Sequence, residues 1–276
     1  MLKRILVGLD GSDYADSAIA VSTQIAKTYD ATIVGLAIVD VPGIEKHLGG
    51  APAGAIYYAE KEREDKINDA KKRTRGFLYD FKKKCEDAGV KYELVSQTGS
   101  PYEVIIEESK TTDLVIIGLR TFFHYETQDK SGETLKHLLE HTASPVLAVP
   151  NKVDSLQNVL LTYDGSVPSA RAIRMRVHLT KRMAIKWTVL TVTDDPKEGE
   201  KLLSGLLKYL KAHEIDAETL VLPGNPNEVI LEVAKKMPGV QVVMGAYSKR
   251  TIREWLFGST AKNLIEDGTI PLFVYH

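Results

Sequence analysis

The chain has 276 residues, of which 43% are hydrophobic and 26% charged, a composition that is typical of globular proteins rather than disordered ones. Lys and Arg number 36 against 37 Asp and Glu, so the net charge of −1 provides no broad electrostatic surface for nucleic acid or anionic lipid. The single cysteine excludes an internal disulfide and no stretch approaches the ~20 apolar residues of a membrane helix, so we expect a cytoplasmic protein that binds neither nucleic acid nor membranes.

Short β-branched segments alternate with helical patterns along the first half of the chain. The predicted strands are 3–9, 32–39, 91–97, 113–118 and 146–149. The predicted helices are 13–29, 58–88, 101–110 and 132–142. This alternation, with continuously apolar strands, favours a parallel sheet that is covered by helices on both faces. In such sheets ligands bind beyond the carboxyl ends of the strands, where the strand order reverses.

The helix predicted at 58–88 is amphipathic, and it lies beside an irregular segment. Cys85 falls on its apolar face, so we interpret it as a small buried hydrophobe and not as a nucleophile. The basic runs 71–73 and 82–84 fall on its polar side, which indicates a solvated face. Gly, Pro and Ala dominate residues 41–58, so we expect this segment to be a mobile excursion that serves as a lid or a partner contact.

The second half of the chain repeats the first. The matching segments are 5–12 with 159–166, 99–105 with 224–230, 115–118 with 242–245, and 144–149 with 270–275. Four matches in the same order indicate a duplication, and the polar residues 150–155 between the copies indicate a linker. The sequence therefore predicts two α/β domains, 1–150 and 155–276, each an open parallel five-stranded sheet flanked by helices.

The first candidate site is the Asp-Gly-Ser sequence at 10–12 and its copy at 164–166, directly after the first strand of each half. An acid at the carboxyl end of a strand is well placed to contact a ligand. A purely structural alternative stays open, in which the Asp and Ser side chains only cap the helix that follows.

The second candidate site follows the fourth strand of the second half. Gly245 begins a loop that leads to Gly258, Ser259 and Thr260, which open a helix. The first N–H groups of that helix lack internal partners, and together with the hydroxyls and the positive helix end they suit a phosphate. The alternative is again a capped helix after a long turn, with solvated basic residues in the loop.

These segments together resemble a tandem universal stress protein, in which each half is similar to one domain of the family. The ATP-binding members of that family carry Gly-x-x-Gly, nine further residues and Gly-Ser/Thr after strand four. The second half fits this pattern with one departure, Ser248 in place of the second glycine. The resemblance covers nearly the whole chain and implies a Rossmann-like fold of the adenine nucleotide alpha hydrolase type.

The resemblance also implies a ligand and its binding residues. The expected ligand is ATP, AMP or ADP, with Mg²⁺ as an open addition. Adenine would lie near Asp164 and the backbone around Val192. The phosphates would be bound by Gly245, Ser248, Gly258, Ser259 and Thr260. The family further implies that the last strands, 146–149 and 272–275, pair edge to edge in an intramolecular pseudo-dimer, while a homodimer and an unidentified protein partner stay open.

The first half departs further from the pattern. Gly132 is the counterpart of Gly258, and Glu133 stands where the second half has Ser259. A carboxylate about 4 Å from a phosphate charge costs about 4 kcal/mol at an effective dielectric constant of about 20. We therefore expect the loop of the first half to be degenerate for nucleotide polyphosphates.

The sequence His137-x-x-Glu140-His141 matches a pattern of some zinc peptidases. Its counterparts in the second half are Asn263, Glu266 and Asp267, and the sequence identifies no third ligand, so we expect no metal there. Neither a P-loop nor a dinucleotide fingerprint is present. No nucleophile, base and orienting residue can be assigned, so we do not expect an enzyme.

The sequence thus predicts an adenine-nucleotide-binding protein with a stress-response or regulatory role, which binds mainly through its second half. Two alternatives stay open. One is an interaction or dimerisation module whose nucleotide sites are both vestigial. The other is a slow ATPase, which requires a metal and a positioned water.

Overall fold

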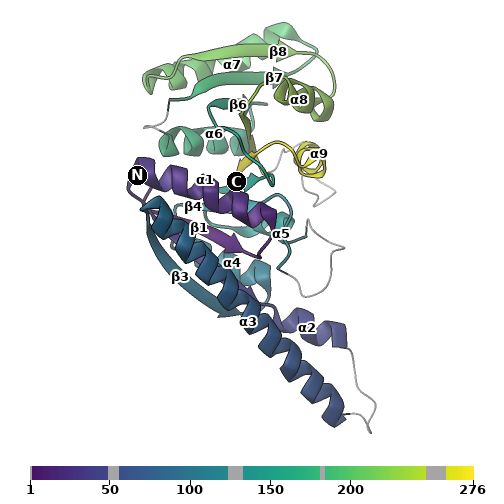
Figure 1. Ribbon diagram of the computed structural model, residues 1–276. Helices are drawn as coiled ribbons and strands as arrows, with labels where there is room; N and C mark the ends of the chain where they lie inside the picture. The colour runs from purple at the N-terminus through teal and green to yellow at the C-terminus, as the bar shows by residue number, and fades with distance from the viewer. Residues whose placement is uncertain (1, 49–55, 124–132, 181–183, 247–258) are drawn as a thin grey trace. The chain divides into compact units, whose positions relative to one another are not determined.

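The computed structural model describes residues 2–48, 56–123, 133–180, 184–246 and 259–276. They form two compact units, Leu2–Ser144 and Pro145–His276, which are described separately below. Both alternate strands and helices along the chain (Figure 1). The predicted α/β class is confirmed, and within the described residues no helix is long and apolar enough to cross a membrane.

The strands of the first unit are all parallel and follow the order β3-β2-β1-β4. Their bounds are β1 Arg4–Leu9, β2 Thr32–Val39, β3 Lys91–Thr98 and β4 Leu114–Gly118. The helices are α1 Asp13–Tyr29, α2 Val41–Leu48, α3 Ile56–Ala88, α4 Pro101–Ser109 and α5 Glu133–His141. Helices α1 and α3 lie side by side over this sheet (Figure 1). Strands β1, β2 and β4 are buried because helices cover them, as their continuously apolar sequences predict.

The second unit contains five parallel strands in the order β10-β9-β6-β7-β8. Their bounds are β6 Asn158–Thr162, β7 Lys186–Val192, β8 Ala217–Leu222, β9 Val240–Gly245 and β10 Leu272–Tyr275. The helices are α6 Val167–Leu179, α7 Pro196–Ala212, α8 Pro226–Lys235 and α9 Ser259–Asp267.

The fifth strand of the first repeat, β5 (Val146–Val149), belongs by its contacts to the second unit. It runs antiparallel to β10, with Leu272 opposite Ala148 and Val274 opposite Val146. The predicted edge-to-edge pairing of the two last strands is therefore confirmed. Because each strand satisfies the edge of the other, neither leaves its hydrogen-bonding groups open on this side.

Helix α2 corrects the expectation of an irregular segment across 41–58. Asp40 precedes the helix, and its carboxylate accepts a hydrogen bond from the backbone N–H of Gly43 (3.0 Å), as an N-cap does. Ile44 is 0% exposed and packs in one cluster with Val39 and Ala70. The expectation of a mobile excursion is thus wrong for 41–48, because one buried isoleucine and a cap outweigh the Gly, Pro and Ala composition. Residues 49–55 lie outside the described residues.

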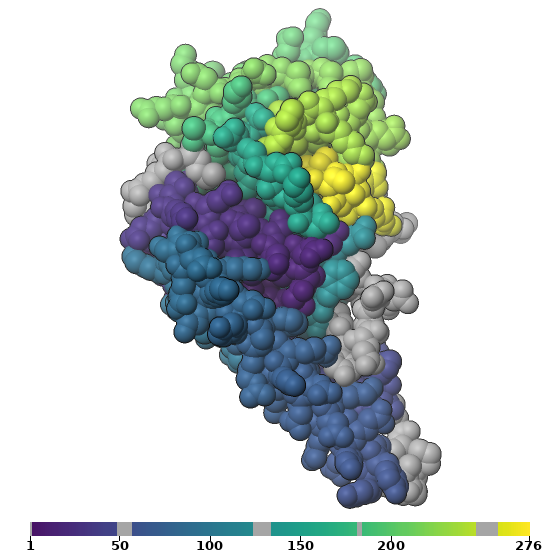
Figure 2. Space-filling view, viewed as in Figure 1, coloured from purple at the N-terminus to yellow at the C-terminus, as the bar shows by residue number. Residues whose placement is uncertain are grey.

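The long helix α3 confirms two other expectations. Cys85 is 0% exposed, and burial raises the pKa of its thiol to about 11, so it behaves as a buried hydrophobe. The basic residues 71–73 are exposed, and α3 lies open at the surface of the space-filling view, in blue (Figure 2). The solvated face is therefore confirmed for 71–73, whereas in the run 82–84 Lys82 and Lys84 are half-buried and pair with Glu86 and Asp16.

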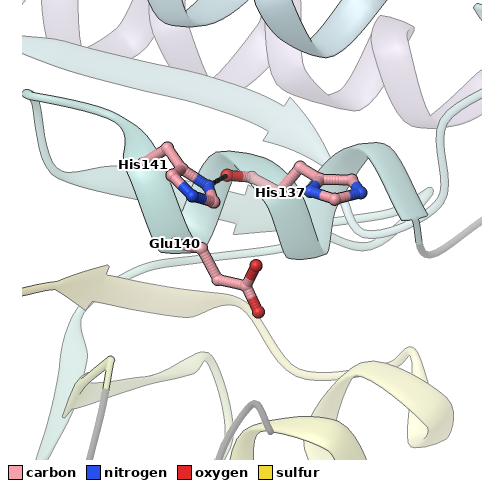
Figure 3. A group of neighbouring side chains, drawn as sticks. All are labelled: His137, Glu140 and His141. Carbon is pink, nitrogen blue, oxygen red and sulfur yellow. Dashed lines mark hydrogen bonds between the residues drawn. The ribbon is translucent and has the colours of Figure 1, made fainter. Parts of the chain in front are cut away.

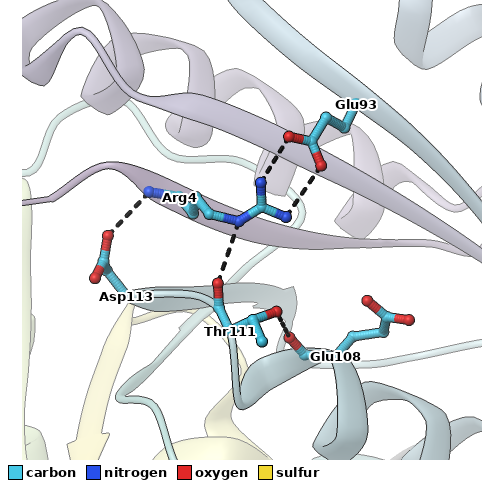
Figure 4. A network of polar contacts seen from close by, with 5 residues as sticks. All are labelled: Arg4, Glu93, Glu108, Thr111 and Asp113. Atoms are coloured by element: carbon cyan, nitrogen blue, oxygen red, sulfur yellow. Dashed lines mark hydrogen bonds and ion pairs between the residues drawn. The ribbon is translucent and has the colours of Figure 1, made fainter.

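A polar network joins the amino-terminal ends of the strands in the first unit (Figure 4). The guanidinium of Arg4 donates to both carboxylate oxygens of Glu93 (2.6 and 3.0 Å) and to the backbone oxygen of Thr111 (3.2 Å). Asp113 accepts from the backbone N–H of Arg4 (2.9 Å). The network lies at the end of the sheet opposite to the strand carboxyl ends. Since its side chains are well exposed, solvent screens the Arg4–Glu93 ion pair and it contributes little to stability.

Ile44 is the most deeply buried side chain of α2, beside the partly buried Val41 and Leu48, so we predict that it makes the largest single contribution to the docking of α2. Removing a fully buried isoleucine side chain costs about 2–5 kcal/mol. If that cost falls on α2, Ile44→Ala should accelerate amide hydrogen exchange across 41–48 by ~30-fold or more, with β1 and β2 still protected. The matched control is Lys46→Ala, an exposed position on the same helix, which should leave the exchange unchanged. Equal exchange in the two variants would contradict the docking of α2.

Candidate functional site

The candidate site of the second unit lies at the carboxyl ends of β9, β6 and β7, which are adjacent in the sheet. Strand β7, which follows β6 in the sequence, lies on one side of β6 in the sheet, and β9 lies on its other side. The strand order therefore reverses between β6 and β9, and in an open parallel sheet this is where ligands bind. Asp164, Val192 and Gly245 each lie at the end of one of these strands.

Asp164 shapes the turn between β6 and α6. Its Oδ1 accepts hydrogen bonds from the backbone N–H of Ser166 (2.9 Å) and from the hydroxyl of Ser169 (2.7 Å). Gly165 has a φ of 75°, which lies in the left-handed region that favours glycine. The Ser166 hydroxyl accepts from the N–H of Ser169 and caps α6. The capping alternative thus holds for Ser166, while Asp164 stays exposed at the strand end.

Val192 is the last residue of β7. Thr162 of β6 pairs with Leu190 of β7, so Asp164 and Val192 each lie two residues beyond the same pair. The hydroxyl of Thr191 donates to the backbone oxygen of Tyr163 (2.8 Å) and fixes the turn against β7. The register therefore places Asp164 and Val192 at neighbouring positions at the carboxyl ends of β6 and β7.

Gly245 is required by a close approach of two backbones. A Cβ at this position would lie 2.6 Å from the backbone nitrogen of Ser169 and would also clash with the backbone of Pro168. The first turn of α6 rests directly on the end of β9 because Gly245 has no side chain. Gly118 has the same role in the first unit, where a Cβ would lie 2.6 Å from the Cβ of Tyr14 in α1.

Ser259 and Thr260 form the first turn of α9, and both contact a residue that sequence reasoning missed. Their hydroxyls donate to Oδ1 of Asn227, at 3.0 Å from Ser259 and 2.5 Å from Thr260. Asn227 lies in the first turn of α8, where its own N–H is bound by Oδ1 of Asn225. The repeated segment 224–230 was the available signal, but the repeat has Tyr102 at this position and so did not mark the amide as functional. Ser248 and Gly258 lie outside the described residues.

Asp10 is the counterpart of Asp164 in the first unit, and its carboxylate accepts hydrogen bonds from Ser12 and Phe122. Its Oδ1 accepts from the N–H (3.0 Å) and the hydroxyl (2.5 Å) of Ser12, and its Oδ2 accepts from the backbone N–H of Phe122 (2.7 Å). Burial raises the pKa of the Asp10 carboxyl, although the hydrogen bonds from Ser12 and Phe122 act in the opposite direction. The segment after β4 thus folds onto the strand-one acid.

Phe123 fills the end of strand β1 in the first unit. Its side chain is 7% exposed, and its ring lies so close to Gly8 that a Cβ there would be 2.6 Å from the ring Cζ. The second unit has Thr162 in place of Gly8, and its hydroxyl donates to the backbone oxygen of Val243 (3.0 Å). A ring cannot pack in the same way against Thr162, so the two units differ at the strand end that faces the candidate site. Gly132 and the side chain of Glu133 lie outside the described residues.

Comparisons with known proteins agree on one family. The model of the universal stress protein family matches residues 1–150 and 155–276. A universal stress protein of Synechocystis sp. is 21% identical over 99% of this chain and 100% of its own length. Another, from Bacillus subtilis, is 27% identical over 42% of this chain and 96% of its own length. The crystal structure of a universal stress protein from Archaeoglobus fulgidus covers 98% of this chain and 95% of its own, with a TM-score of 0.74 and 19% identity.

The packing of Gly245 predicts a stability difference between two glycine positions of the second unit. Gly245→Ala should destabilise the unit by about 1–3 kcal/mol, because the new methyl group meets backbone atoms that cannot move aside cheaply. Gly205→Ala, in an open position inside α7, should stabilise it by about 0.5–1 kcal/mol. Denaturant unfolding of both variants measures the two changes. A neutral Gly245→Ala would show that α6 does not depend on this close approach.

Proposed function

The chain belongs to the universal stress protein family, and from this premise we propose that it binds an adenine nucleotide, ATP or AMP, at the strand ends of its second half. We propose a regulatory role without catalysis. The groups that would bind the ligand are a carboxylate, hydroxyls and backbone amides, which hold a nucleotide without activating a nucleophile.

The difference between Asp10 and Asp164 carries the assignment to the second half. Asp10 is partly buried and accepts a hydrogen bond from the N–H of Phe122, and the ring of Phe123 packs against Gly8 of the same strand end. Asp164 is exposed and follows a strand whose end carries Thr162 in place of that glycine. A ligand at the first site would have to displace the segment after β4 and break the Phe122 hydrogen bond. A ligand at the second site meets an exposed carboxylate, whose Oδ1 also accepts hydrogen bonds from Ser166 and Ser169.

The start of α9 supports a phosphate position. Its first N–H groups lack partners within the helix, and the helix dipole favours negative charge there. Asn227 Oδ1 accepts from both Ser259 and Thr260, so it orients two hydroxyls at the same helix end. Phosphate oxygens are acceptors of the same kind, so they can take these donors over from Asn227 without leaving a hydroxyl unpaired. In the first repeat the counterpart of Ser259 is Glu133, whose charge repels a phosphate.

Ligand-induced stabilisation tests the proposal. ATP at 100 times its dissociation constant should stabilise the binding-competent fold by about 2.7 kcal/mol, which raises the melting temperature by several degrees. Ser259→Glu places a carboxylate at the phosphate position and should abolish the shift. Ser204→Glu adds the same charge at an exposed serine of α7 and should leave it intact, as should Glu133→Ala in the first half. Mass spectrometry of ligand released from the purified protein identifies the nucleotide.

Two results would contradict the proposal in different ways. If Ser259→Glu keeps the full shift while Asp10→Ala loses it, the nucleotide binds the first half. If neither ATP nor AMP shifts the wild-type protein, the sites are vestigial and the chain is an interaction module.

A further inference from the structure

We propose that His137, Glu140 and His141 of helix α5 form a binding site for a divalent transition metal ion, with zinc as the best match. The site lies within the first unit and is independent of the nucleotide site proposed for the second. The sequence alone predicts no metal here because it identifies no third ligand.

The geometry of α5 supplies that third ligand. Residues that are three and four positions apart lie on the same side of a helix, so the spacing of 137, 140 and 141 gathers the three side chains. One potential ligand atom from each residue lies within 4.8 Å of the others (Figure 3). Zinc requires nitrogen and carboxylate oxygen at ~2.0–2.2 Å, so the three side chains have to rotate further toward one another when the ion binds.

Each imidazole ring already has a partner within the protein before any ion binds. The Nδ1 atom of His141 lies 3.1 Å from the backbone oxygen of His137. A carbonyl oxygen only accepts, so Nδ1 carries the proton and Nε2 keeps its lone pair for a metal. This is the outer hydrogen bond that metal-binding histidines usually make. The ring of His137 stacks on Tyr102 of α4, with ring centroids 4.7 Å apart and an interplanar angle of 26°.

The donor set selects the class of ion. Two imidazole nitrogens and one carboxylate oxygen suit zinc and its transition-metal neighbours, whereas Mg²⁺ and Ca²⁺ prefer oxygen ligands throughout. His137 and Glu140 are half-buried and His141 is exposed, so an ion enters directly from solvent and keeps water at its remaining position.

The second repeat lacks this donor set. Asn263 and Asp267 replace the two histidines on α9, and the Asp267 carboxylate is paired with Lys235 at 2.5 Å. The two helices that follow the fourth strands have therefore diverged in chemistry. Helix α9 offers hydroxyls at its start, and α5 offers imidazoles in its last two turns.

Calorimetric titration of the full-length, chelator-treated protein with Zn²⁺ tests the site. One zinc ion should bind per chain. His137→Ala and His141→Ala should each weaken the binding by about 10-fold or more, which exceeds the loss expected from a neutral surface change. Glu140→Gln removes the carboxylate charge with little change in shape, and it should also weaken zinc binding. Circular dichroism of each variant verifies that the helix content is kept.

The matched control is the other histidine pair, His178 and His213 in the second unit, whose ring centroids are 5.6 Å apart. The double variant His178→Ala/His213→Ala should bind zinc as the wild type does. Co²⁺ bound in place of zinc should give a visible absorption spectrum of low coordination number, which the His137 variant loses. Unchanged zinc affinity in folded His137→Ala or Glu140→Gln, or its loss in the control, would overturn the proposal.

Discussion

The close approach of the first helix of each repeat to the end of the fourth strand determines where the candidate site lies. In the second unit Pro168 and Ser169 of α6 rest on Gly245, and in the first unit Tyr14 of α1 rests on Gly118. No side chain fits at either glycine. This contact places the strand-one acid and the start of the helix at the point where the strand order reverses. The ligand-binding geometry of the fold thus depends on an interaction between two backbones.

The two repeats share this frame, and the strand-one acids Asp10 and Asp164 differ in exposure. Gly11 and Gly165 have the same φ of 75°, and each precedes a serine that caps the next helix. In the first unit the segment after β4 supplies the partner of Asp10 from the backbone of Phe122. This intramolecular hydrogen bond needs no ligand. It stabilises the fold, and it occupies one oxygen of the Asp10 carboxylate.

The helices that follow the fourth strands show the same divergence. Helix α9 begins with two hydroxyls that Asn227 orients, whereas α5 stacks His137 on Tyr102, the residue that stands in Asn227's place. One exchange between repeats, amide against aromatic ring, therefore changes the partner of the neighbouring helix. The polar side chains thus lie at the start of α9 and in the last two turns of α5.

The sequence by itself determined the α/β class, the repeat and the strand bounds of the first half to within one residue, because continuous apolar segments and helical periodicity are local signals. The repeat also placed Asp164 and Gly245 at strand ends, whereas Val192 was expected only from the family resemblance. Helix α2 was missed because its stability comes from Ile44 packing against Ala70 of a distant helix, while its local composition favours a loop.

Only the tertiary structure decided which groups meet. The Phe122 amide binds Asp10 across 112 positions of sequence, and Asn227 accepts from Ser259 across 32. Neither pairing can be recognised in the sequence. Every residue except proline has a backbone N–H, and an asparagine at the start of a helix resembles an ordinary cap. Local propensity determines which elements form, and the approach of distant backbones determines which polar groups become partners.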